Sequence, residues 1–360
     1  MSLVVDHFLH HNSYHPVKDR LIESKWDKKK RIDTWLIDWA KCEDTIVSRE
    51  SSRLFLVASV ARTFVPGRKY DICLLFIGKQ DLGKSTMLKM LAEKEVWFED
   101  GVDLHHVKQK EMMEQMQGVR IVEFAEMAGF NKADDDKIKK LITKGHFRAR
   151  KAFGKRTSFE LLESVYTGTS NNEKILKDTT GNRRWIILRC GDSIDLEKFE
   201  EVVGQLWAEA YEVYLKEYAL TEDEIEDGGI PKSKWLVLSP EAKELAKVAA
   251  EEARIPTTNE HKILAAIAGK TGWIWHDDIC DACDLPSVQP IKNEIAAVLQ
   301  MAGAADKKVS KWIPELKGNR TVWYIGTHEH RMVMNPVGNK AQARDFAQTL
   351  KKGEVVAKVS

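Results

Sequence analysis

Residues 72–78 read Ile-Cys-Leu-Leu-Phe-Ile-Gly, and residues 78–86 continue as Gly-Lys-Gln-Asp-Leu-Gly-Lys-Ser-Thr. The apolar run is too short for a helix and fits a buried parallel strand, and residues 86–92 have the pattern of a helix. Gly78 to Ser85 therefore form a complete G-x-x-x-x-G-K-S/T phosphate loop, in the strand–loop–helix setting that this motif requires. The stretch predicts an α/β domain that binds a nucleoside triphosphate.

The residue types of this loop follow from the chemistry of a triphosphate. Gly78 and Gly83 let the backbone approach a dense anion and point N–H groups toward it, and the helix that follows adds its positive end. Lys84 is expected to reach the β- and γ-phosphates, and the Ser85 hydroxyl is expected to bind Mg²⁺. With Thr86 at the start of the helix, the loop predicts ATP and Mg²⁺ as cofactors.

Length, charge and cysteine content limit the number of folded units and the cellular compartment that we expect. The chain has 360 residues, which predicts two or three folded units. Its 56 basic and 55 acidic residues leave a net charge of +1, which argues neither for nor against DNA binding. Five scattered cysteines, no secretory leader and no long apolar run predict a cytoplasmic protein without a membrane partner.

Cys280 and Cys283 form a C-x-x-C pair that follows His276 by one helical turn. A zinc site would need a second pair of cysteines or histidines at ligand spacing, and the sequence has none. We therefore favour two semi-buried helix cysteines over a metal site.

The pattern of the chain predicts five parts. They are a helical segment over 1–50, a phosphate-loop ATPase core over 51–220, a linker with a helix over 221–260, a winged-helix-like α+β domain over 261–330, and a flexible tail over 331–360. Helices are expected over 32–41, 51–61, 199–218, 240–252, 261–268 and 288–301, parallel core strands over 119–124, 161–167 and 185–188, and a hairpin from 307–312 and 321–325.

A triphosphatase also needs acids at the end of a second strand. Glu123 and Glu126 stand in this position after the apolar residues of 119–124. We assign Glu123 to the Mg²⁺ side and Glu126 to the base that draws a proton from the attacking water, with an exchange of the two roles as the alternative. Two surface glutamates at a strand end are the less favoured alternative.

Residues 144–156 carry six cations and no acid. The cations are Lys144, Arg148, Arg150, Lys151, Lys155 and Arg156. Phe147 and Phe153 alternate with them, and Gly154 can turn a hairpin. Such a strip can neutralise backbone phosphates and offer aromatic faces to unstacked bases of single-stranded DNA. A solvated basic loop is the alternative.

Two further polar groups follow in the sequence. Asn171 ends a predicted strand and is placed to orient water against the γ-phosphate. Arg183 and Arg184 precede the next strand, where a guanidinium can stabilise charge on the transferring phosphoryl group, including that in a neighbouring subunit. Structural salt bridges are the alternative for the two arginines.

The order of these motifs resembles the virulence-associated protein E family of phage and mobile-element ATPases, which are related to superfamily 3 helicases. The resemblance covers residues 15 to about 215 and rests on 15–17, 25–27, 31–36, 61–62, 66–67, 78–86, 121–126, the basic strip, 168–171 and 178–184. It implies an AAA+-like core that assembles as a ring, most often a hexamer, with the basic strip as a hairpin facing a channel for single-stranded DNA.

The resemblance also implies roles for single residues. Asn171 corresponds to the sensor residue, and Arg183 or Arg184 to the arginine finger. Lys79, Asp81 and Leu82 depart from the smaller residues common in the family's loop, which points to slower turnover. No primase domain precedes the core, so a separate primase partner is implied.

These motifs are compatible with three functions. The leading hypothesis is a phage- or mobile-element-encoded ATPase that translocates on or unwinds DNA during replication in the bacterial cytoplasm. The alternative is an ATP-binding switch or assembly factor in phage–host interference. A small-molecule kinase is disfavoured because no arginine-rich lid follows the core. Residues 288–301 are either a DNA-recognition helix with Lys307, Lys308 and Lys311 near phosphates, or part of a core.

Overall fold

A computed structural model describes residues 15–102, 109–127, 132–150, 157–177, 182–221, 223–224, 230–269, 272–302, 309–313 and 318–325. By contacts between residues, the chain forms two units, Met1–Ile255 and Pro256–Ser360. The finer division into five parts stays a prediction. No helix among the described residues is long and apolar enough to cross a bilayer.

The first unit is built on a five-stranded parallel sheet. Its order is β2 (Phe98–Glu99), β3 (Ile121–Phe124), β6 (Val165–Ser170), β1 (Cys73–Ile77) and β7 (Trp185–Arg189). The prediction of an α/β fold with a parallel sheet is confirmed. The strand predicted over 161–167 was wrong at its start, because Leu161 ends another strand, and apolar periodicity does not identify the pairing partner of a strand.

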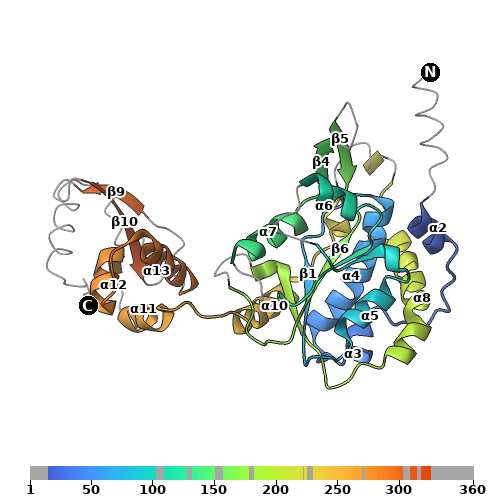
Figure 1. The fold of residues 1–360 in the computed structure, drawn as a ribbon, viewed down its shortest axis with the longest axis horizontal. Helices are drawn as coiled ribbons and strands as arrows, with labels where there is room; N and C mark the ends of the chain where they lie inside the picture. The colour runs from blue at the N-terminus through green and yellow to red at the C-terminus, as the bar shows by residue number, and fades with distance from the viewer. Residues whose placement is uncertain are drawn as a thin grey trace. The chain divides into compact units, whose positions relative to one another are not determined.

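Helices cover both faces of this sheet (Figure 1). Along β1, Leu74 and Phe76 enter one apolar cluster, whereas Leu75 and Ile77 enter another. The first cluster contains side chains of α4 (Ile46–Phe64), α5 (Lys84–Leu91) and α8 (Leu196–Val213), and the second those of α7 (Lys132–Ile142). The alternation is that of a strand with both faces buried, and β1 is an inner strand of the sheet, between β6 and β7.

The remaining elements of this unit are shorter or lie at its edges. They are α2 (Pro16–Ile22), α3 (Trp35–Asp38), α6 (Gln109–Gln115), α10 (Pro240–Glu252), the 3₁₀ turns Glu95–Trp97, η3 (Asn182–Arg184) and Lys232–Lys234, the π-helical turn Tyr214–Tyr218, and the hairpin β4 (His146–Arg150) and β5 (Thr157–Leu161).

Two predicted helices differ from the structure. The helix expected over 32–41 is only the single turn α3, because Lys41 has φ +55°, which does not continue a helix, and the Cys42 N–H donates back to the Leu36 carbonyl over 3.1 Å. The helix expected over 51–61 begins five residues earlier, since the Thr45 hydroxyl accepts from the Ser48 N–H and caps α4 at Ile46. The left-handed conformation of Lys41 therefore limits the first helix, and the Thr45 cap, which was overlooked in the sequence, sets the start of the second.

The described residues of the second unit form three helices and a small antiparallel sheet. The elements are α11 (Glu260–Ile267), β8 (Gly272–Trp275), α12 (His276–Cys283), α13 (Gln289–Met301), β9 (Val309–Ile313) and β10 (Gly318–Ile325), with sheet order β8-β10-β9. Cys280 and Cys283 are buried in its apolar core. Ile295 and Leu299 of α13 are buried there too, so one face of this helix is core, and Lys307 and Lys308 lie outside the described residues.

Candidate nucleotide-binding site

The loop between β1 and α5 has the backbone shape that its glycines predict. The Gly78 N–H donates to the Ser170 carbonyl over 3.2 Å, which fixes the start of the loop to the neighbouring strand. Gly83 has φ +90° and caps α5, and a Cβ there would lie 3.1 Å from the Leu196 side chain. Both its conformation and its packing therefore require glycine.

Lys84 lies inside this loop and is 7% exposed. Its Nζ donates to the carbonyl oxygens of Gly78 (2.8 Å) and Lys79 (2.7 Å) and to Asn171 Oδ1 (3.0 Å). Burial lowers the pKa of this ammonium group. Because all three acceptors are uncharged oxygens, an incoming phosphate would supply the negative charge that the buried ammonium lacks.

Glu123 faces the loop from β3 and is fully buried. Its Oε1 accepts hydrogen bonds from Ser85 Oγ and Thr169 Oγ1, both over 2.6 Å. Its Oε2 is buried and has no partner among the described residues. Burial is the main cause that raises the pKa of this carboxyl group.

This donor set fits Mg²⁺. The cation prefers oxygen ligands and is commonly held by one or two carboxylates together with substrate phosphates. The unpartnered Oε2 of Glu123 and the Ser85 hydroxyl provide such oxygens beside the phosphate loop. The described residues contain no cluster of three or more His, Cys, Asp or Glu side chains, and a site of this kind does not need one.

The other predicted site residues differ in burial and in their contacts with Lys84 and Glu123. Asn171 follows the end of β6 and contacts Lys84 directly. Ser85 and Thr86 are exposed at the start of α5. Glu126 is exposed, two residues beyond β3, with φ +50°, so its role as base stays a prediction. The carboxyl ends of β1, β3 and β6 thus gather the loop, the acid and the amide at one edge.

Two residues of this site were missed in the sequence. Thr169 shares Glu123 Oε1 with Ser85, and its hydroxyl at a strand end was the available signal. The Cys190 N–H donates to the Ile77 carbonyl over 2.8 Å, and a hydrogen bond from Cys42 lowers the pKa of the Cys190 thiol. No local signal marks Cys190, because its place beside the loop depends on the pairing of β1 with β7.

Arg183 and Arg184 lie at the opposite end of the sheet from the phosphate loop. They belong to η3, and β7 starts immediately afterwards, with Trp185 level with Cys73 at the start of β1. Gly78 follows the far end of β1, so about 20 Å separates the two positions at about 3.3 Å per residue. Arg183 is exposed, and neither arginine forms an ion pair with any residue that the structure describes.

The basic strip forms the expected hairpin in the part that the structure describes. Strands β4 and β5 pair with His146 opposite Leu161 and Arg148 opposite Phe159. The side chain of Lys144 lies over the Phe147 ring at 4.3 Å. Lys151, Phe153, Gly154, Lys155 and Arg156 lie outside the described residues, as does the side chain of Arg150.

The aromatic face of the hairpin differs from the prediction. Phe147 is 2% exposed and packs into an apolar cluster of the core, so it cannot offer a face to a base. Phe159 is instead 51% exposed, stacked on His146 at 4.5 Å, with the Arg148 guanidinium 5.4 Å from its ring centre. Side chains directly opposite in an antiparallel pair share a face, so His146, Arg148 and Phe159 form one surface.

This difference in burial predicts a large loss of stability for one phenylalanine substitution and a small loss for the other. Phe147→Ala should lower the free energy of unfolding by about 3–5 kcal/mol, since it leaves a cavity in the core. Phe159→Ala, on the exposed face of the same hairpin, should lower it by about 1 kcal/mol or less, because only surface ring contacts are lost. Chemical denaturation of both variants measures the difference, and equal losses would contradict the assignment of faces.

Comparisons with known proteins match the chain to a family model and to solved structures of another protein. A family model described as the virulence-associated protein E-like domain matches residues 21–254. No curated protein matches the chain. An apo structure of the NrS-1 C-terminal region (305–718) is similar, with 14% identity, a TM-score of 0.45, and coverage of 85% of this chain and 78% of that chain. An A-form apo structure of the NrS-1 C-terminal region has 16% identity, a TM-score of 0.44 and the same coverage.

Proposed function

Because the chain belongs to the virulence-associated protein E-like domain family, we propose that it is an ATP-dependent DNA translocase or helicase that acts in replication of a phage or mobile element. The observation that carries the proposal is the convergence of the phosphate loop, Glu123 and Asn171 at one edge of the parallel sheet. The proposal includes an AAA+-like, superfamily 3-like core working in the bacterial cytoplasm, with priming supplied by a separate primase.

The residues of the site have distinct tasks in ATP hydrolysis. Lys84 holds the β- and γ-phosphates once these replace its present carbonyl and amide partners. Mg²⁺, held by Ser85 and the free oxygen of Glu123, would offset phosphate charge. Asn171 orients the attacking water, and Glu126 accepts its proton, with Glu123 as the alternative base.

Hydrolysis in this proposal requires a neighbouring subunit. Arg183 and Arg184 lie too far along the sheet to reach the triphosphate of their own chain. An arginine finger from this turn would therefore act on the nucleotide of an adjacent copy, which a closed ring such as a hexamer provides. Arg183 is the better candidate of the two, since it is the more exposed.

The hairpin supplies the contact with single-stranded DNA. On its exposed surface, Phe159 and His146 offer ring faces on which a base can stack, and Arg148 adds a cation beside them. Lys144, Arg150, Lys151, Lys155 and Arg156 would neutralise backbone phosphates. ATP closure across the subunit boundary would then move the hairpin together with the strand.

The most direct test measures ATP hydrolysis with and without a single-stranded oligonucleotide. We expect stimulation by DNA. Changing Arg148, Arg150 and Lys151 together to alanine should weaken binding of the oligonucleotide at least about 10-fold near 100 mM salt, because two phosphate contacts and the cation beside the stacking surface are lost. The same variant should lose most of the stimulation, while hydrolysis without DNA stays measurable.

Matched controls make this test specific. Lys243→Ala with Lys247→Ala removes two exposed lysines from α10 and should leave both readouts near wild type. Hydrolysis that ignores DNA, or a triple variant that binds and responds normally, would rule out the hairpin's role. Strand displacement with ATP separates a helicase from an ATP-binding switch, and sizing with a non-hydrolysable analogue tests the ring.

A further inference from the structure

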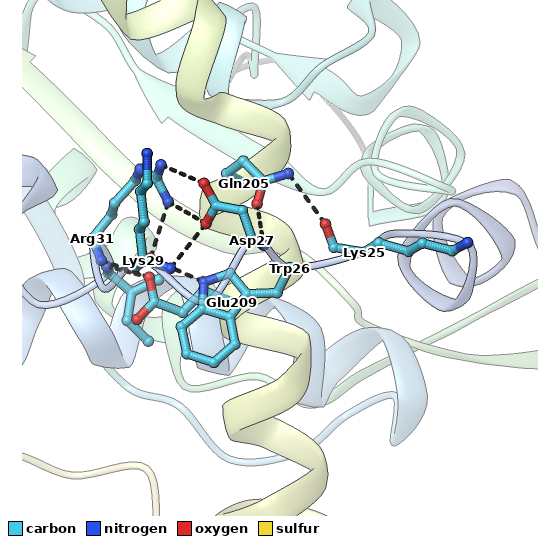
Figure 2. Close-up of polar contacts among 8 residues, drawn as sticks. Lys25, Trp26, Asp27, Lys29, Arg31, Gln205 and Glu209 are labelled. Atoms are coloured by element: carbon cyan, nitrogen blue, oxygen red, sulfur yellow. Dashed lines mark hydrogen bonds and ion pairs between the residues drawn. The ribbon is translucent and has the colours of Figure 1, made fainter.

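A second basic element lies outside the hairpin and the nucleotide site. Residues 25–31, Lys-Trp-Asp-Lys-Lys-Lys-Arg, connect α2 with the turn before α3 and are called the lysine loop here. The loop carries five cations and one acid. It lies against α8 of the first unit (Figure 2).

Helix α8 holds the backbone of this loop at both ends. At the first end, Gln205 accepts from the Asp27 N–H (2.8 Å) and donates to the Lys25 carbonyl (3.1 Å). At the other end, Glu209 is buried and accepts from the N–H groups of Arg31 (2.6 Å) and Ile32 (3.1 Å). The loop is therefore a fixed element, although it has no regular secondary structure.

The only acid of the loop is already engaged. Asp27 binds the Arg31 guanidinium through both oxygens, each over 2.8 Å, and this hydrogen-bonded pair lowers the pKa of Asp27. It also accepts from the Lys29 N–H. Arg31 and Asp27 thus neutralise each other, and the loop keeps the charge of its lysines.

The charges of the four lysine ammonium groups are not neutralised by ion pairs among the described residues. Lys25, Lys28, Lys29 and Lys30 are exposed, and none forms an ion pair within the described ranges of the chain. Figure 2 shows the Lys25 side chain extending away from the cluster. Four like charges within six residues repel one another, so their concentration is unfavourable for the isolated protein.

The backbone conformation of Lys28 is also unfavourable for the stability of the folded protein. Its φ is +67°, a region in which a Cβ meets the backbone and which glycine adopts freely. Glycine at this position would remove both the strain and one repelling charge. Strain kept at an exposed position, together with unpaired charge, points to a binding function rather than to folding.

We propose that the lysine loop binds the phosphate backbone of DNA, as a second contact separate from the hairpin. Fixed ammonium groups bind phosphates by releasing counterions from the DNA, and adjacent lysines suit the close phosphate spacing of a strand. The one apolar side chain of the loop, Trp26, is half-buried, and its indole N–H donates to the Lys29 carbonyl over 3.0 Å. A single ring held in this way is a weak anchor for a lipid surface, which favours a polynucleotide over a membrane. This contact does not depend on ATP hydrolysis.

The test uses the full chain without nucleotide and measures fluorescence anisotropy with single- and double-stranded oligonucleotides of one sequence. Lys28→Gly alone should weaken binding about 2–3-fold, and Lys28→Gly with Lys29→Gln and Lys30→Gln about 10-fold near 100 mM salt. For single strands, the slope of log affinity against log salt should shrink by about 2 in the triple variant. The DNA form that loses affinity identifies the form that the loop binds.

Lys28→Gly separates binding from folding, because glycine fits the loop better than lysine. Its Tm should equal that of the wild type or exceed it by up to about 4 °C. Lys243→Gln with Lys247→Gln, on α10, removes charge elsewhere and should change DNA affinity less than twofold. If this control lost as much DNA affinity as the loop variants, the overall charge of the protein would explain the effect, and the proposal would be overturned.

Two other results would also overturn it. One is unchanged affinity and salt slope of the triple variant for both DNA forms. The other is a loss of binding to poly-L-glutamate without a loss of DNA binding, which would assign the loop to an acidic protein. Because nucleotide is absent, failure here leaves the ATPase proposal intact, and a protein without ATPase activity can still show the loop's effect.

Discussion

Lys84→Ala should lower kcat/KM for ATP hydrolysis by at least about 100–1000-fold, the loss expected when a donor to the transferring phosphate is removed. The ammonium of Lys84 is almost fully buried and is held by three uncharged oxygens at the mouth of the loop. Alanine removes the positive charge that would face the β- and γ-phosphates of a bound nucleotide. Steady-state phosphate release and nucleotide titration calorimetry measure the two consequences, slower turnover and weaker binding.

Lys79→Ala is the matched control in the same loop. The Lys79 side chain is 76% exposed and pairs with Asp192, which is 88% exposed, so it is directed at solvent. Surface ion pairs of this kind contribute little, and the variant should keep hydrolysis within about threefold of wild type. If Lys84→Ala retained a tenth of the activity, or if both lysines mattered equally, the phosphate loop would not be the hydrolytic site.

Glu123→Gln should raise the stability of the folded protein while it lowers the rate of ATP hydrolysis. The carboxylate is fully buried with one unpartnered oxygen, so its charge destabilises the folded protein at neutral pH. Glutamine keeps an oxygen that accepts from Ser85 and Thr169 but carries no charge. We expect hydrolysis to fall at least about 100-fold and the free energy of unfolding to rise by about 1 kcal/mol at pH 7.

The stability gained by Glu123→Gln should depend on pH. Burial raises the folded-state pKa of Glu123 above its ordinary 4.5, so the folded state takes up a proton first as the pH falls. The wild type therefore recovers stability between the raised pKa and about 4.5, and the advantage of Glu123→Gln shrinks over this window. Urea titrations at several pH values measure it. A variant advantage that is constant with pH would contradict the assignment to the carboxylate.

Local signals in the sequence were sufficient for several elements. The helix over 240–252 was predicted with the bounds of α10, because Ser239 caps it through the Ala242 N–H and Pro240 opens it. The strand, loop and first turn around Gly78 to Ser85 were predicted for a similar reason. In both cases, the residues that determine the structure are neighbours in the chain.

The outward face of the hairpin needed the tertiary structure. A strand has two faces by its two-residue period, but the period does not say which face meets the core. Phe147 was therefore predicted as a partner of bases although it is buried, and Phe159 was overlooked although it is exposed. Only the packing of the hairpin on the first unit decides between them.

The sequence by itself determined the strand, loop and helix around Gly78 to Ser85, the parallel α/β core and the family, because these depend on contiguous residues and on the apolar period of single elements. The tertiary structure alone decided that Thr169 shares Glu123 with Ser85 and that Arg183 lies at the far end of the sheet from the loop. The physical reason is strand pairing, which sets distances between residues that are remote in the chain and leaves no local trace in the sequence.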